Sequence, residues 1–495
     1  MPDSDGQGNS GPPERASDPE GHGVSVVLTS SPLQRIGAFA LAALAKSSSP
    51  EMITPAAFAA VTDRMTRDLL RTSELAKAAD PGGFWLSASY LLWPNSKINP
   101  TARGRQSPRE RREQISAWRT PQAALRRLGV PCAYCGREAC DWFGKVDIPL
   151  GASVAYRNTT APGHQGTALC FPCVSCLWAF PYGAALSGGR AAAIHSWDDE
   201  FLARVTRSAV QQTLERAAIA APVKGAKKSP YARELAVLTA VREYGRQSRR
   251  ITAPVELLVL SNSNKEQVLV TQEMSQPIAE WLRSTVRDAD RRGGYAALAA
   301  TQATKQVPGE AYLAKRAFAR PAHVLSAAVA NLLTRAAASQ GAVPPEVASL
   351  HAIVHSYCIE VLTMDEKDVE RITLLAGRLA ALLGQDSRPG PFRDFIRANS
   401  RGGNLYGWFR SRAVEWQLLP RPEGTEPVLL PVRDYRLLFE DERSWSWRRL
   451  LTFAVLEALA NNGWQPKGST EEMRELQDEL SDSADSDSDS DNDEN

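Results

Sequence analysis

The sequence predicts an α+β fold that is predominantly helical, and three observations support this prediction. Apolar residues recur at helical spacing through most of the chain after residue 311. Two apolar runs, 254–260 and 265–271, flank the turn Ser-Asn-Ser-Asn and predict a β-hairpin. Two Cys-x-x-Cys pairs lie upstream of this hairpin, and they indicate a small metal-bound lobe inserted into an N-terminal α/β region.

The N-terminal region contains a clear helix start. Ser107 and Glu110 have the spacing of a capping box, with Pro108 at the first helical position. The helix that begins there is expected to carry three arginines outward: Arg109, Arg112 and Arg119. Residues 93–100, which precede it, are expected to form a polar loop between two prolines.

The two cysteine pairs, Cys132-Ala-Tyr-Cys135 and Cys170-Phe-Pro-Cys173, have the spacing of a four-thiolate zinc site. Each pair can direct two sulfur atoms at one ion, and two pairs complete a tetrahedron. This closed coordination is typical of one structural zinc ion and leaves no position for a reacting water. A thioredoxin-like redox role fits less well, because the second pair belongs to a local run of three cysteines. Two nearby cysteines are alternative ligands: Cys140 and Cys176.

The C-terminal region is predicted to be a helical bundle. Thr363 and Glu366 have the spacing of a second capping box, and Gly384 is placed to end the helix. Such a helix would bury an apolar stripe formed by Val369, Ile372, Leu375, Leu379 and Leu382. A stripe of this kind is typical of a bundle core rather than of a cofactor site.

Composition and charge define the remaining segments. Residues 478–495 hold nine acidic residues and no basic one, so this tail is expected to be disordered and solvated. The first residues of the chain are expected to be disordered for the same reason. The predicted domains are a disordered arm (1–24), an N-terminal domain (25–130), the zinc lobe (131–195), a mixed helix and hairpin region (196–310), the C-terminal bundle (311–470) and the acidic tail (471–495).

The net charge of +2 conceals an uneven distribution. Without the acidic tail the chain carries about +11, and its basic residues gather in two segments, 97–127 and 224–250. Arginine forks match phosphate oxygens, so two basic segments on either side of a zinc lobe predict a surface that binds nucleic acid. Solvated helix faces, the alternative interpretation, usually mix both signs more evenly.

Length and cysteine usage indicate the compartment. The chain has 495 residues, 43% of them hydrophobic and 23% charged, which is typical of a soluble globular protein of roughly two to four domains. Its longest apolar run, 36–45, is about half as long as a membrane span, and the N-terminus lacks the pattern of an export signal. Seven cysteines, six of them in one cluster, favour a reducing compartment. We therefore expect a cytoplasmic protein without membrane partners.

Known catalytic motifs are absent from the sequence. It contains no glycine-rich phosphate loop, no Gly-x-Ser-x-Gly turn and no His-Glu-x-x-His. His351 and His355 are spaced like metal ligands on a helix, but their apolar neighbours favour an ordinary helix face. His164 and His195 lie near the zinc lobe and are more typical of turn or core residues than of catalytic bases. The sequence therefore predicts a protein that is not an enzyme.

Several segments together resemble one family. They are Leu28-Thr-Ser-Ser-Pro-Leu-Gln-Arg-Ile-Gly37, Tyr90-Leu-Leu-Trp-Pro-Asn-Ser-Lys-Ile-Asn-Pro100, Cys-Ala-Tyr-Cys-Gly, Cys-Phe-Pro-Cys with Trp178-Ala-Phe-Pro-Tyr-Gly183, and Ile194-His-Ser. In order and spacing they resemble the large subunit of type I CRISPR interference (Cascade) complexes, in the CxxC-CxxC subclass and most like subtypes I-B and I-A. The resemblance spans roughly residues 25 to 200. Beyond that, only the length and the helical C-terminal region match.

The resemblance implies a non-catalytic subunit of an RNA-guided complex. Such subunits recognise the short motif beside a double-stranded DNA target, help to open the duplex and guide the displaced strand. Its partners would be the guide RNA, the target DNA, the other subunits of the complex, and a recruited helicase-nuclease or transposition proteins. Guide pairing reads the target sequence in such systems, so the protein supplies motif recognition and charge.

The polar loop and the basic segment after it are the candidate nucleic-acid contacts. Side-chain amides and a cation on a short loop suit base edges, and arginines suit phosphates. The candidates are Asn95, Lys97 and Asn99 for the motif, and Arg103, Arg105, Arg109, Arg112 and Arg119 for the backbone. Two alternatives remain: a zinc-supported nuclease with His164 or His195 as the base, and a stand-alone zinc protein that binds nucleic acid without a guide.

Overall fold

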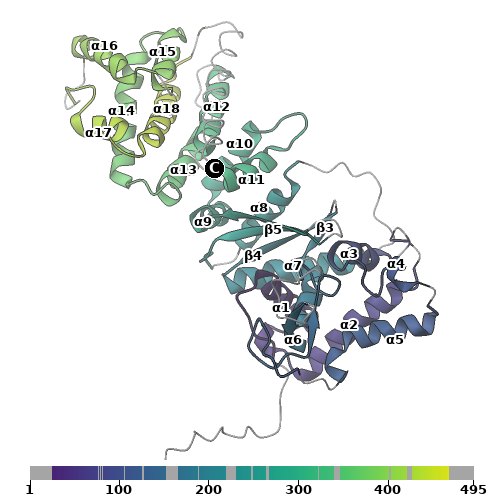
Figure 1. Ribbon diagram of the computed structural model, residues 1–495. Helices are drawn as coiled ribbons and strands as arrows, with labels where there is room; N and C mark the ends of the chain where they lie inside the picture. Colours follow the sequence, from purple (N-terminus) through teal and green to yellow (C-terminus); the bar gives the residue numbers. More distant parts are fainter. Residues whose placement is uncertain are drawn as a thin grey trace, which may run out of the picture.

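The chain, described by a computed structural model, is predominantly helical, and its described residues form two small antiparallel sheets (Figure 1). The structure describes residues 25–467 except 76, 79, 81, 105, 125–127, 152–165, 188, 219–229, 247–248, 263–266, 321–322, 339–345, 401–402, 421–425 and 466. Both predicted disordered ends, 1–24 and 471–495, therefore lie outside the described residues. No helix in the described part of the chain has the length and hydrophobicity needed to span a membrane.

The elements before residue 220 surround the cysteine pairs. Their bounds are α1 Pro32–Leu44, η1 Pro50–Met52, α2 Pro55–Thr72, α3 Phe84–Leu92, α4 Pro100–Arg103, α5 Pro108–Arg119, η2 Pro121–Ala124, β1 Asp141–Phe143, β2 Thr167–Leu169, α6 Phe171–Ala179, η4 Phe180–Gly183, β3 Ala185–Ser187, β4 Arg190–Ser196 and α7 Asp199–Ala218.

The elements after residue 230 form the hairpin and the later helices. Their bounds are α8 Ala232–Tyr244, β5 Val255–Asn262, β6 Gln267–Met274, α9 Gln276–Ser284, α10 Ala289–Thr301, α11 Gly309–Ala319, α12 His323–Ala338, α13 Glu346–Glu360, α14 Glu366–Leu383, α15 Gly390–Asn399, α16 Leu405–Leu418, α17 Val432–Phe439 and α18 Ser444–Asn461.

The larger sheet has the strand order β3-β4-β5-β6, and it separates two hydrophobic cores. Successive side chains of a strand point to opposite faces. In β5, Leu257 and Val259 belong to the core of the later helices, whereas Leu258 and Leu260 belong to the core of the N-terminal helices. Figure 1 shows this sheet between α1, α3 and α7 on one side and α8 and α9 on the other. The predicted hairpin is confirmed as β5 and β6.

The core of the later helices is continuous. It joins buried residues from Phe201 to Trp464, and within it α10 packs directly against α13 and α12. This core therefore runs across residue 311, where the sequence predicts a domain boundary. Further along, α14 and α18 pack against each other.

The helix starts are confirmed at α5 and displaced at α14. At α5 the Ser107 hydroxyl accepts from the Glu110 amide, and the Glu110 carboxylate accepts from the Ser107 amide. At α14 the N-cap is Asp365, whose carboxylate accepts from two amides of the first turn. Thr363 has a positive φ of 52° and does not cap the helix. The predicted apolar stripe is confirmed as buried: Val369, Ile372, Leu375, Leu379 and Leu382.

Candidate metal centre

The first cysteine pair lies in a tight turn. The amide of Cys132 donates to the Arg137 carbonyl at 2.6 Å, and the Gly136 amide donates to the Cys132 carbonyl at 2.9 Å. Gly136 has φ 75°, which glycine adopts without steric cost. The Ala133 amide donates to the Ala168 carbonyl and so joins the turn to β2. This bonding holds both cysteines of the first pair on one side of the turn.

The second pair lies at the start of α6. Cys170 directly follows β2 and is the N-cap residue, and Cys173 lies in the first turn. Backbone amides at a helix N-terminus favour negative charge, which suits two thiolates. β2 pairs with β1, so the strand, the turn and the helix start form one compact unit.

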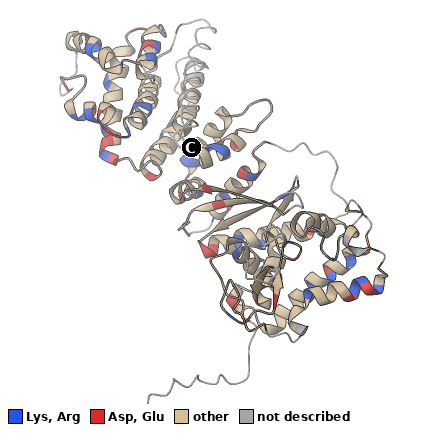
Figure 2. Ribbon diagram, viewed as in Figure 1, with Lys and Arg blue, Asp and Glu red and all other residues tan. Residues whose placement is uncertain are grey.

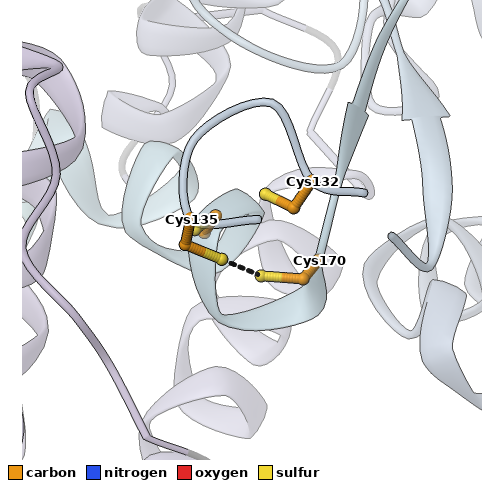
Figure 3. Close-up of side chains that lie close together, drawn as sticks. Cys132, Cys135 and Cys170 are labelled. Atoms are coloured by element: carbon orange, nitrogen blue, oxygen red, sulfur yellow. Dashed lines mark hydrogen bonds between the residues drawn. The ribbon is translucent and has the colours of Figure 1, made fainter. Parts of the chain in front are cut away.

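The side chains of Cys132, Cys135 and Cys170 lie close together (Figure 3). The Sγ atoms of Cys132, Cys135, Cys170 and Cys173 all lie within 4.8 Å of one another. Those of Cys135 and Cys170 are 3.4 Å apart. A tetrahedral zinc–thiolate site with Zn–S bonds of about 2.3 Å has sulfur atoms about 3.8 Å apart, so the cluster has the size of a metal site. Three of the four cysteines are buried, which suits closed coordination.

The ionisation of these thiols is coupled. Hydrogen bonds from Cys170 and Cys173 lower the pKa of Cys132, whereas the pKa of Cys173 is raised because its sulfur donates to that neighbour. Four adjacent thiolates would repel one another in the absence of a cation. A divalent ion would remove this conflict, and the chemistry it would supply is structural, because the four thiolates leave no open position.

The two alternative ligands do not join the cluster. The Cys140 thiol donates to the Leu169 carbonyl at 3.3 Å, and burial raises its pKa to about 12. Cys176 is fully buried in α6, where its sulfur accepts from Gln34 Nε2 at 3.5 Å. Both are protonated packing residues.

The cluster supports the contact between α6 and α1. A Cβ added at Gly37 would lie 1.9 Å from the Cys176 carbonyl oxygen, so the two helix backbones touch at this point. Gln34 of α1 adds a hydrogen bond to the Cys176 sulfur of α6. A metal ion that fixes the start of α6 would thereby also fix α1, which lies at the centre of the N-terminal core.

Arg119 is buried, contrary to the expectation that it faces outward. Only 3% of its surface is exposed, and its guanidinium carbon lies 4.8, 4.2 and 4.4 Å from the ring centroids of Trp93, Trp118 and Trp178. Burial lowers the pKa of Arg119 to about 9, so it is still charged at neutral pH. Cation–π contacts with three rings compensate for lost hydration. In this position Arg119 cannot bind phosphate.

Asn99 of the polar loop is also buried, so its side chain cannot contact a base edge. Its side chain accepts from the Ser89 hydroxyl and donates to the Trp93 carbonyl at 3.3 Å. Asn95 and Lys97 are exposed, and Asn95 has φ 61°. The loop therefore presents two of its three polar side chains to solvent and uses the third to hold its own shape.

The remaining predicted arginines lie on or near α5. Arg109 and Arg112 are exposed and pair with Glu113 and Glu74 respectively. Hydrogen bonding from Arg112 lowers the pKa of Glu74. Figure 2 shows acidic residues next to basic ones along α5, so this face is less uniformly positive than the sequence suggests. Arg103 ends α4, but its side chain and all of Arg105 lie outside the described residues.

Of the two histidines named for the nuclease alternative, the structure describes only His195. His195 on β4 is completely buried, and its Nδ1 lies 2.7 Å from a Glu256 carboxylate oxygen. Burial lowers the pKa of His195. His164 lies outside the described residues.

One positioning residue could not be inferred from the sequence. Asn262 belongs to the predicted turn Ser-Asn-Ser-Asn, yet it ends β5 and is fully buried. Its Nδ2 donates to three carbonyls that belong to the polar-loop region and the zinc lobe: Leu92, Lys145 and Ile148. No local signal marks such a residue, because its partners lie more than 100 positions away.

Comparisons with protein-family models, with curated proteins and with solved structures find no match to this chain.

Proposed function

We propose that this chain is the large subunit of an RNA-guided type I CRISPR surveillance complex. In this role it recognises the motif adjacent to a double-stranded DNA target and stabilises the opened duplex and the displaced strand. It is not an enzyme, and it recruits a separate helicase-nuclease or transposition machinery. It works in the cytoplasm with a guide RNA and the other subunits, and it holds one structural zinc ion on Cys132, Cys135, Cys170 and Cys173.

The observation that carries the proposal is the joint arrangement of the four-cysteine cluster and the polar loop. The cluster anchors α6, and Trp178 of α6 holds Arg119 together with Trp93, the residue at which the loop begins. Asn262 ties the residue before Trp93 to the zinc lobe. The exposed Asn95 and Lys97 thus lie on a loop that is fixed at its base, as motif readout requires.

Most of the segments that carry the family resemblance gather in one core. Ile36 of α1, Trp93 before the loop, and Cys173 and Tyr182 around α6 belong to the N-terminal hydrophobic cluster, whereas Ile194 of β4 packs against the core of the later helices. Sequence similarity in these segments therefore concerns the fold, whereas the exposed loop residues decide which motif is bound.

The two basic segments lie in different parts of the structure. Arg109 and Arg112 lie on α5, whereas Arg242 lies on α8, beside the core of the later helices, and pairs with Glu310. These are exposed or half-buried ion pairs that contribute only about 0–1 kcal/mol each. Phosphate groups can displace such weak acidic partners, so the arginines can serve as backbone contacts of the complex.

The decisive experiment is to isolate the chain from its host under native conditions and to sequence any RNA that accompanies it. The proposal requires a multi-subunit particle that carries a short RNA with repeat-derived ends. A monomer that binds DNA or RNA without guide and partners would support the stand-alone zinc protein instead. Divalent-metal-dependent cleavage by the isolated chain would support the nuclease.

A further inference from the structure

One side of α16 carries a row of exposed apolar side chains. Tyr406, Val414 and Leu418 are separated by eight and four residues, so they lie on the same side of the helix. They are 51%, 65% and 80% exposed, whereas Phe409 and Trp416 on the other side are buried. Large apolar side chains that adjoin one another at the surface are typical of a contact site.

Helix α17 extends this apolar surface. The ring centroid of Tyr406 lies 6.0 Å from that of Tyr435 on α17. Near the other end of α16, Gln417 Nε2 donates to the Pro427 carbonyl at 2.8 Å, a few residues before α17 begins. Val432, the first residue of α17, is 70% exposed. We call the exposed side of the two helices the α16–α17 face, and its members are Tyr406, Arg410, Val414, Leu418 and Val432.

The α16–α17 face also carries positive charge. Arg410 lies between Tyr406 and Val414, is exposed, and forms no ion pair within the part of the chain that the structure describes. Arg436 lies one turn after Val432, and its ion pair with a carboxylate of the same helix is long, at 3.7 Å. The face therefore suits an amphipathic segment whose apolar side is flanked by carboxylates.

The chain itself has such a segment after its last described residue. Ser469 and Glu472 have the spacing of a capping box, and Met473, Leu476 and Leu480 recur at i, i+3 and i+7. This pattern predicts an amphipathic helix over 470–480. These residues include five carboxylates and one arginine. A helix shorter than about 12–15 residues is marginal in water, so this one needs a surface that covers its apolar side.

The described chain ends close to α16. Trp464 packs on Phe392 of α15, with ring centroids 5.8 Å apart. Phe395 of α15 packs in turn on Trp408 of α16 at 5.2 Å. The point at which the segment leaves is thus separated from α16 by α15 alone. The row of apolar residues on α16 is about 18 Å long and a helix over 470–480 about 16 Å, so their lengths match.

We propose that residues 470–480 dock on the α16–α17 face of the same chain as an acidic amphipathic helix. The apolar side of the segment covers the apolar residues of the face. Its carboxylates lie near Arg410 and Arg436, which supply the complementary charge. This contact lies within one chain, so it does not depend on the function proposed above.

Trypsin measures the docking, because Arg474 lies inside the segment and is the only basic residue after Lys467. The full chain is digested briefly, and the initial rate at which the peptide 475–495 is released is measured by mass spectrometry. Leu418→Glu places a charge on the face, and Leu480→Gln removes an apolar residue from the segment. Each should raise the rate about tenfold or more, because cleavage follows the population of the undocked form. The double variant should be no faster than the faster single variant.

Met52→Glu is the matched control for a charge at an exposed apolar position. Met52 is 68% exposed and belongs to η1, in the N-terminal half. This variant should release the peptide like the wild type, and thermal unfolding should show that all variants are folded.

Three results would overturn the proposal: equal rates in all variants, acceleration by Leu480→Gln without acceleration by Leu418→Glu, or equal acceleration by Met52→Glu. Slow cleavage that becomes fast on dilution, with a dimer detected by light scattering, would also overturn it, because the segment would then dock on a second copy of the chain.

Discussion

At the scale of single residues, the burial of a charged side chain depends on contacts with residues that are remote in the sequence. The three tryptophans around Arg119 come from residues 93, 118 and 178, and Trp118 and Trp178 also donate hydrogen bonds to Asp147. A helical pattern identifies Arg119 as basic but not as buried. Only the assembled fold brings the aromatic faces together.

Replacing Arg119 by alanine should therefore destabilise the N-terminal half. A desolvated cation–π contact contributes about 2 kcal/mol or more, and the lost side chain leaves a cavity, so we expect a loss of roughly 2–4 kcal/mol. Chemical unfolding followed by tryptophan fluorescence measures it. The matched variant is Arg109→Ala, whose exposed pair with Glu113 contributes only about 0–1 kcal/mol. Similar losses of stability in the two variants would contradict a stabilising role for the contacts of Arg119 with the three tryptophans.

The His351–Glu457 pair gives a pH dependence whose sign is fixed. The hydrogen bond to Glu457 raises the pKa of His351 above its usual 6.5. A histidine with a raised pKa stabilises the fold below the unfolded pKa, and this contribution is lost as the pH rises through the folded pKa. The difference in unfolding midpoint between wild type and H351Q should therefore shrink as the pH rises above about 6.5. A difference that is constant or grows would refute this assignment.

At the scale of elements, residue spacing predicts a feature when the interacting residues lie close together in the chain. The cysteine pairs, the α5 capping box and the hairpin were all predicted, because each depends on residues a few positions apart or on a repeated motif. The start of α14 was displaced by two residues, because Asp365 competes successfully with Thr363 for the cap.

The metal site at the turn and α6 should hold one zinc ion. Cys132→Ser should lose the metal and much of the soluble folded protein, because binding energy at a structural zinc site is folding energy. Elemental analysis of the purified chain measures the stoichiometry. Cys140→Ser is the control, since this thiol bonds to a backbone carbonyl instead of joining the cluster. Well-folded wild type without metal would exclude the zinc assignment.

The contact of α1 with α6 can be tested through two glycines. Gly37→Ala places a methyl group against the Cys176 carbonyl, and it should destabilise the fold by about 1–3 kcal/mol or more. Gly377 is an exposed residue of α14 with no neighbouring atom within 4 Å of an added Cβ. Gly377→Ala should therefore stabilise by about 0.5–1 kcal/mol. The opposite signs are measured by denaturant unfolding, and a stabilising Gly37→Ala would mean that the helices can separate.

At the scale of the whole molecule, the central sheet connects the two halves. Its strand β5 faces both cores, and Asn262 at its end reaches the polar-loop region and the zinc lobe. The sequence predicts the hairpin but not that β4, from residues 190–196, pairs with it. Strand pairing over such a separation has no local signal, which is why the two-core architecture was not predicted.

The proposed function assigns motif recognition to the polar loop and attraction of a polyanion to the arginines of α5. If Asn95 or Lys97 contacts base edges, replacement by alanine should cost about 1–3 kcal/mol at one motif position and leave the others unchanged. If Arg109 and Arg112 contact phosphates, their replacement should weaken all sequences alike and lower the salt slope by roughly one unit per contact. Binding of the assembled complex to motif variants at two salt concentrations measures both effects.

Asn99→Ala is the control for the loop, because its buried bonds to Ser89 and Trp93 predict lost stability without a change in motif preference. Uniform weakening by the Asn95 and Lys97 variants would mean that the motif is read elsewhere on the chain.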